Sequence, residues 1–60
     1  MFTNRQQQII DAAIELIAEA GIQKLTIKNL SAKVNLTEGA IYRHFTSKME
    51  ILLGILKLFK

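Results

Sequence analysis

The sequence predicts an all-α fold, in which a three-helix bundle contains a helix-turn-helix and is followed by the start of a fourth helix. Proline is absent from all 60 residues, which favours helix throughout. Aliphatic residues recur at intervals of three and four along most of the chain, as on one face of an α-helix. Threonine or serine precedes each of the four apolar segments, and these residue types cap helix N-termini. A chain of this length makes one small domain with a modest core.

The first helix is predicted from about Arg5 to Ala20, after a short arm formed by residues 1–4. Thr3 and Gln6 have the spacing of a capping box at its start, and Gly21 is a suitable residue to end it. Its acidic residues recur every four positions and are expected to form a solvated face: Asp11, Glu15 and Glu19.

The segment from Thr26 to Phe45 predicts two short helices joined by a tight corner. Thr26 and Thr37 are expected to cap the two helices. Each threonine has a leucine before it and an aliphatic residue four positions after it, a spacing that fixes the angle at which a chain enters a helix. These apolar pairs are Leu25 with Leu30, and Leu36 with Ile41.

Three residues of this segment meet the packing needs of a helix-turn-helix. Ser31 is small enough for a second helix to cross nearby, Asn35 tolerates a left-handed corner, and Ile41 is expected to be buried. The alternative for the segment is an ordinary two-helix corner of a bundle.

The last helix is expected to begin at Ser47, with Glu50 completing a second capping box and Lys48 in the first turn. Seven of the nine residues from 51 to 59 are large and apolar, too many for one exposed face of a terminal helix. About ten residues are too few to span a bilayer. We therefore expect either that the chain is a fragment of a longer protein or that this helix finds another partner.

The charge is distributed unevenly along the chain. Residues 1–20 hold one basic against three acidic residues, a net charge of −2, whereas residues 21–60 hold seven basic against two acidic residues, a net charge of +5. This asymmetry favours a polyanion as the partner of one side of the fold, although a merely solvated basic surface explains the charge equally well.

Composition excludes several kinds of chemistry. The chain has no cysteine and a single histidine, His44, so the sequence supplies neither a disulfide framework nor a metal site. No set of nucleophile, base and orienting group can be assembled, and we expect no enzyme and no cofactor. No signal peptide is recognisable. These features predict a cytoplasmic protein that is not bound to a membrane.

The sequence resembles the N-terminal DNA-binding domain of the TetR family of bacterial transcriptional regulators. The resemblance runs from about Arg5 to Leu53 and includes Gly21 and the Leu25-Thr26 pair. Its most specific part is the motif G-A-I-Y-R-H-F-x-S-K, which lies between Gly39 and Lys48. A helix-turn-helix pattern alone is weak evidence, whereas this combination at fixed spacing is specific.

The resemblance implies sequence-specific binding of double-stranded DNA, with a recognition helix from Glu38 to Phe45 in the major groove. It implies a transcriptional repressor with a helix-turn-helix domain at residues 1–46 and the first part of a connecting helix at residues 47–60. In the family, a C-terminal domain that this chain lacks binds a small-molecule inducer and forms a homodimer, which reads a palindromic operator. An alternative is a small helical module that binds a protein or a membrane surface through the apolar last helix.

The resemblance places DNA contacts at or near eight residues: Thr26, Thr37, Glu38, Gly39, Tyr42, Arg43, His44 and Lys48. Residue chemistry adds Lys28, which can anchor a phosphate as Lys48 does, and Ala40, which can touch a thymine methyl. Gly39 and Ala40 together would let the backbone approach DNA closely.

Each polar candidate has a second interpretation. Tyr42 is expected to donate its hydroxyl to a phosphate, or else is half-buried in the core. Arg43 is expected to read guanine, unless it contacts phosphate or is solvated. His44 is assigned to phosphate or to a structural hydrogen bond. Thr37 both caps its helix and offers a hydroxyl to phosphate, and Glu38 either accepts from cytosine or favours its own helix N-terminus.

Overall fold

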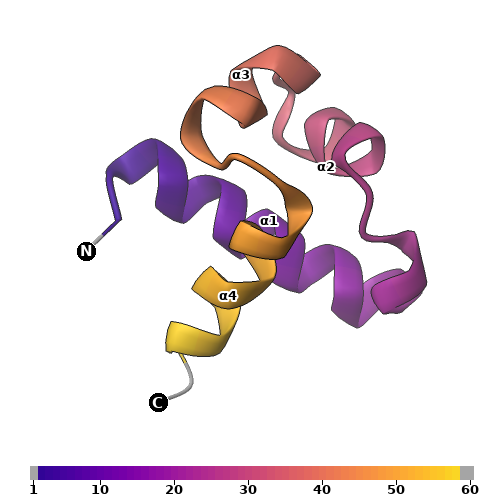
Figure 1. Cartoon of the computed structure of the whole chain (residues 1–60). Helices are drawn as coiled ribbons and strands as arrows, with labels where there is room; N and C mark the ends of the chain where they lie inside the picture. Colours follow the sequence, from indigo (N-terminus) through magenta and orange to yellow (C-terminus); the bar gives the residue numbers. More distant parts are fainter. Residues whose placement is uncertain (1, 59–60) are drawn as a thin grey trace.

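The structure, a computed structural model, describes residues 2–58 and is all-α within that range. Its elements, shown in Figure 1, are α1 (Asn4–Ala20), the 3₁₀ turn η1 (Ile22–Lys24), α2 (Ile27–Val34), α3 (Glu38–His44) and α4 (Lys48–Leu58). The apolar residue Phe59 of the predicted last helix lies outside the described residues, as does Lys60.

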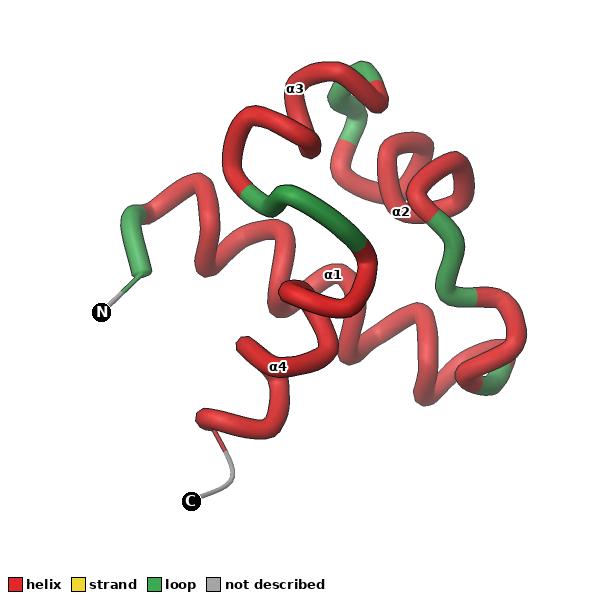
Figure 2. The backbone as a smooth tube through the Cα atoms, viewed as in Figure 1, coloured by secondary structure: helices red, strands yellow, loops and turns green. Residues whose placement is uncertain are grey.

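α1 is the longest helix, and α2, α3 and α4 all pack against it. Figure 2 shows α2 and α3 together on one side of α1, while α4 crosses it. The predicted capping box is confirmed: the Thr3 hydroxyl accepts from the Gln6 N–H at 3.1 Å, and the Gln6 carboxamide accepts from the Thr3 N–H at 3.0 Å. Gly21 ends the helix with a φ of 90°, a left-handed value that favours glycine.

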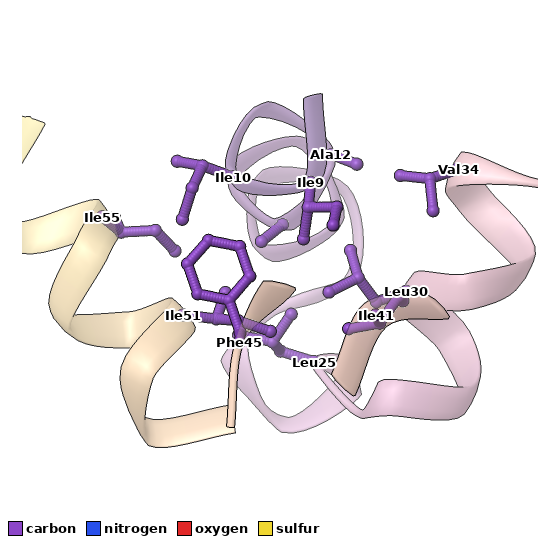
Figure 3. Close-up of a cluster of buried hydrophobic side chains, with 11 residues drawn as sticks. Ile9, Ile10, Ala12, Leu25, Leu30, Val34, Ile41, Phe45, Ile51 and Ile55 are labelled. Carbon is purple, nitrogen blue, oxygen red and sulfur yellow. The ribbon is translucent and has the colours of Figure 1, made fainter. Parts of the chain in front are cut away.

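One hydrophobic core joins the four helices, and Figure 3 shows its side chains meeting between them. Its largest fully buried members are Ile9, Ile10, Leu25, Leu30, Ile41 and Ile51. Burying such a side chain contributes about 1.5–3 kcal/mol. Phe45 is also buried, as predicted, and fills the space between α1 and α4.

The corner between α2 and α3 has the predicted geometry. Asn35 adopts the left-handed conformation with φ 59° and ψ 42°. Ser31 is buried, and its hydroxyl donates to the Lys28 carbonyl at 2.8 Å. The Thr26 hydroxyl accepts from the Asn29 N–H at 3.0 Å and the Thr37 hydroxyl from the Ala40 N–H at 3.1 Å, so both predicted caps are confirmed.

Two local predictions at the end of α3 are corrected. α3 ends at His44 rather than Phe45, because Phe45 leaves the helix in an extended conformation to enter the core. The capping box expected between Ser47 and Glu50 is wrong. The Glu50 carboxylate instead accepts from the backbone N–H of Thr46 at 3.3 Å and from its hydroxyl at 3.0 Å, so it reaches one residue further back into the connection.

The acidic residues of α1 are exposed, as expected, and two of them also contact α2. Lys33 of α2 lies 3.0 Å from a carboxylate oxygen of Glu19 and 3.6 Å from one of Glu15. The hydrogen bond to Glu19 is the main cause of the raised pKa of Lys33, above its ordinary 10.5. Glu15 and Glu19 therefore tie α2 to α1.

α4 packs tightly against α1 at Gly54. A Cβ at this position would lie 2.8 Å from Cδ1 of Ile10 and 3.1 Å from Cζ of Phe2. The opposite side of α4 exposes three large apolar side chains, Met49, Leu53 and Leu56. None of the helices in the described range combines the length and apolarity needed to cross a membrane.

Candidate nucleic-acid interface

α3 presents one broad exposed face, because only Ile41 of its seven residues is fully buried. Successive residues lie about 100° apart around a helix, so the positions 38, 42, 39 and 43 follow one another within about 140°. These are Glu38, Tyr42, Gly39 and Arg43, and all four are exposed. Four of the predicted DNA contacts therefore share one face.

Gly39 lies within this face, between Tyr42 and Arg43 around the helix. Within the described residues, a Cβ at position 39 would approach only the Thr37 hydroxyl oxygen, at 4.0 Å. Packing inside the protein therefore does not require glycine here, and φ is not left-handed. The backbone of α3 is therefore open to close approach from outside at position 39.

Ala40 borders the exposed face, about 60° past Arg43 around the helix, whereas His44 lies outside it, on the side nearer the buried Ile41. Both are only partly exposed. The backbone carbonyl of His44 accepts a hydrogen bond from the Gln6 side chain at 3.3 Å. The structure thus separates these two candidates from the four on the open face.

The remaining candidates lie at the starts of helices. Thr26 and Thr37 cap α2 and α3, and both side chains are exposed. Lys28 lies in the first turn of α2, and Lys48 is the first residue of α4. A helix N-terminus carries free N–H groups and partial positive charge, so a nearby lysine or hydroxyl adds to its attraction for phosphate.

The basic side chains differ in what they contact. Within residues 2–58, Lys33 forms ion pairs with α1, whereas Lys28, Arg43 and Lys48 form none. These three cations therefore remain available to an anionic partner. The same part of the chain contains no cluster of three or more side chains suited to hold a metal ion.

Comparison with known proteins decides the family. A family model described as "Bacterial regulatory proteins, tetR family" matches residues 9–55. The chain belongs to this family. The matched residues of this TetR-family chain include the whole helix-turn-helix and the first part of α4. The chain thus contains the DNA-binding domain of a TetR-family regulator.

Curated relatives agree with this assignment. The chain is 39% identical over 51 residues to the HTH-type transcriptional regulator SrpR of Pseudomonas putida, covering 85% of this chain and 24% of SrpR. It is 36% identical over 56 residues to the nucleoid occlusion factor SlmA of Photobacterium profundum, covering 92% of this chain and 29% of SlmA. It is 36% identical over 53 residues to the fatty acid metabolism regulator protein of Bacillus subtilis, covering 88% of this chain and 27% of that protein. The chain spans about a quarter of the length of these relatives, and no solved structure matches it.

The structure also brings residues to the site that sequence reasoning did not assign to it. Gln6 contacts the end of α3, and Phe2 packs its ring near Phe45 with centroids 6.3 Å apart. From sequence, Gln6 is recognisable only as part of a capping box, because its second hydrogen bond joins residues 38 positions apart. The hydrogen bond from the Asn29 side chain to the Lys24 carbonyl, at 2.8 Å, likewise supports the start of α2 without a sequence signal.

Proposed function

We propose that α3 enters the major groove of an operator with its exposed face toward the bases. A helix of seven residues is about 10 Å long, which suits the groove. The observation that carries the proposal is Gly39, an exposed glycine that internal packing does not explain, flanked by Tyr42 and Arg43.

The residues of the exposed face make different contacts. Arg43 reaches base edges and reads guanine through two hydrogen bonds, worth about 1–3 kcal/mol of discrimination. Tyr42 donates its hydroxyl to phosphate while its ring lies against sugar or a thymine methyl. Glu38 stabilises the N-terminus of its own helix.

The surrounding candidates anchor the backbone of the operator. Thr26 and Lys28 contact one phosphate at the start of α2, and Thr37 and Lys48 contact others at the starts of α3 and α4. His44 donates to phosphate from the side of α3 outside the exposed face, and Ala40 touches a thymine methyl at the border of that face. Contacts to phosphate set the register and make binding salt-dependent.

The whole regulator acts as a homodimer on a palindromic operator, with half-sites about one helical turn, roughly 34 Å, apart. Residues 1–46 form the DNA-binding domain, and residues 47–60 begin a connecting helix to a C-terminal domain that binds a small-molecule inducer. The protein is a cytoplasmic repressor without catalytic activity. The short share of the relatives' length that this chain spans supports the existence of such a second domain in the family.

Two lysines of α4 provide the matched test. Lys48 begins the helix beside α3, and Lys57 lies in its last turn. Both carry one charge and both are exposed. Lys48→Ala should weaken binding to a duplex selected from a random pool and reduce the salt slope by about 1, because one phosphate contact is lost.

Lys57→Ala should change binding and salt slope much less. Equal losses from the two substitutions would show that only net charge matters and would contradict a phosphate anchor at Lys48. Selection from the random pool that enriches no sequence would contradict sequence-specific recognition altogether.

A second function is favoured by one observation, the exposed apolar row Met49, Leu53 and Leu56 on α4. These residues lie at i, i+4 and i+7, which places them on one side of the helix. Such a row would serve a module that docks on a protein or lipid surface. Retention on lipid vesicles without binding to any duplex would favour this function over DNA recognition.

A further inference from the structure

The side chain of Gln6 connects the start of α1 to the end of α3. Its Oε1 accepts from the backbone N–H of Thr3 at 3.0 Å, and its Nε2 donates to the backbone carbonyl of His44 at 3.3 Å. Within residues 2–58, no other side-chain hydrogen bond joins these two helices. Gln6 is partly buried between them.

The His44 carbonyl is one of the last four of α3, which find no N–H donor within the helix itself. The Ile41 carbonyl is satisfied by the Phe45 N–H at 2.9 Å, and the His44 carbonyl by Gln6. Because the hydrogen bond acts at the end of a seven-residue helix, it limits how far α3 can rotate about its axis or tilt from α1.

Phe2 reinforces the same junction. Its ring lies 6.3 Å from that of Phe45 at an interplanar angle of 57°, a tilted arrangement typical of favourable aromatic pairs. Cζ of Phe2 also comes close to Gly54 of α4. Phe2 thus packs where α3 ends and where α4 crosses α1.

We propose that Gln6, supported by Phe2, is a positioning residue for DNA recognition. It touches no DNA, and it holds α3 in the orientation that places Tyr42 and Arg43 in the groove. This inference rests on the proposed function of α3. Base contacts depend on the orientation of α3, whereas nonspecific attraction to phosphate depends mainly on charge. Loss of the hydrogen bond should therefore lower specificity more than general affinity for DNA.

Gln6→Glu separates the two roles of this side chain. A carboxylate still accepts from the Thr3 N–H, and glutamate is as suitable as glutamine in a capping box. It has no N–H to donate to the His44 carbonyl. Gln8→Glu is the matched control for charge, because Gln8 is exposed on another side of α1 and its carboxamide oxygen accepts only from Arg5 at 3.2 Å.

The experiment measures the affinity of each full-chain variant for two duplexes of equal length, one selected by the unmodified protein from a random pool and one with the same bases scrambled. For Gln6→Glu we expect the ratio of the two affinities to fall by about two- to tenfold. The loss of one hydrogen bond lowers the population of correctly oriented α3 by about this factor. For Gln8→Glu we expect the ratio to stay unchanged. The carbonyl ¹³C resonance of His44 should shift in the first variant alone.

Gln6→Met and Thr3→Ala keep the inference testable if a glutamate at position 6 forms new contacts. Gln6→Met removes both the donor to His44 and the acceptor of the Thr3 N–H, and it should lower the ratio. Thr3→Ala weakens the same cap by removing its hydroxyl but keeps the donor, so it should lower stability with the ratio preserved. A ratio that falls equally in Gln6→Glu and Gln8→Glu, or equally in Gln6→Met and Thr3→Ala, overturns the positioning role. An unmodified protein that binds both duplexes equally overturns the proposed function itself, and this inference with it.

Discussion

Substituting alanine for Gly39 should raise the stability of the protein and at the same time weaken its binding to DNA. The new Cβ has room, since the Thr37 hydroxyl oxygen at 4.0 Å is its nearest neighbour among the described residues outside the helix backbone. Glycine is about 0.8–1 kcal/mol less favourable than alanine inside a helix. Position 39 is in the first turn of α3, so we expect a gain of about 0.5–1 kcal/mol. In a domain of this size, that gain raises Tm by roughly 2–8 °C.

The effect on DNA binding has the opposite sign. The methyl group would project from the exposed face between Tyr42 and Arg43, where the proposed function brings the helix backbone against the groove. Forcing a methyl group into a close contact costs about 1–3 kcal/mol. This corresponds to about a 5- to 150-fold loss of affinity.

Thermal unfolding followed by circular dichroism measures the first effect, and fluorescence anisotropy with a selected duplex measures the second. A variant that is stabilised and binds DNA as well as the unmodified protein would refute the close approach of Gly39. A variant that is destabilised would instead refute the helical geometry assigned to position 39.

Three further predictions concern stability. Asn35→Val should cost about 1–2 kcal/mol, because a β-branched residue must adopt a φ of 59°, while Asn35→Gly should be close to neutral in the same urea titration. Gly54→Ala should lower stability by about 1 kcal/mol despite the better helix propensity of alanine, because its Cβ would lie 2.8 Å from Cδ1 of the fully buried Ile10. A gain in stability measured by thermal unfolding would show that Ile10 moves aside. The pKa of Lys33 is raised in the folded protein, so its ion pair with Glu19 contributes fully below pH 10.5 and is lost as the pH rises through the folded-state pKa. The unfolding free energy of Lys33→Met should therefore fall less steeply in that pH range than that of the unmodified protein.

Local signals predicted the fold well because each acts over a few residues. Thr3, Thr26 and Thr37 cap their helices through N–H groups three positions away. Asn35 adopts the left-handed conformation because asparagine tolerates it, which depends on the residue type alone. Such features are visible in a short window of sequence, and so is the apolar period that buries Ile41.

The contacts that tune the site depend on distances that sequence does not contain. The hydrogen bond from Gln6 to His44 and the ion pair from Lys33 to Glu19 join helices whose approach is set by the packed core. The side chain of Glu50 likewise bonds Thr46 in the connection that follows the buried Phe45, so its partner depends on the path of the chain before α4. The need for a small residue at position 54 likewise arises only from the packing of α1 against α4.

Because α3 is short, the binding of DNA to α3 is coupled to the folding of the whole domain. Isolated helices of fewer than about 12–15 residues are marginal in water, so a seven-residue helix exists only while the core holds it. An operator that binds this helix must therefore act as a thermodynamic stabiliser of the whole domain, by about 2.7 kcal/mol at a concentration one hundred times Kd. The duplex that raises the melting temperature of the domain most, among unlabelled candidates of equal length, would therefore be the operator.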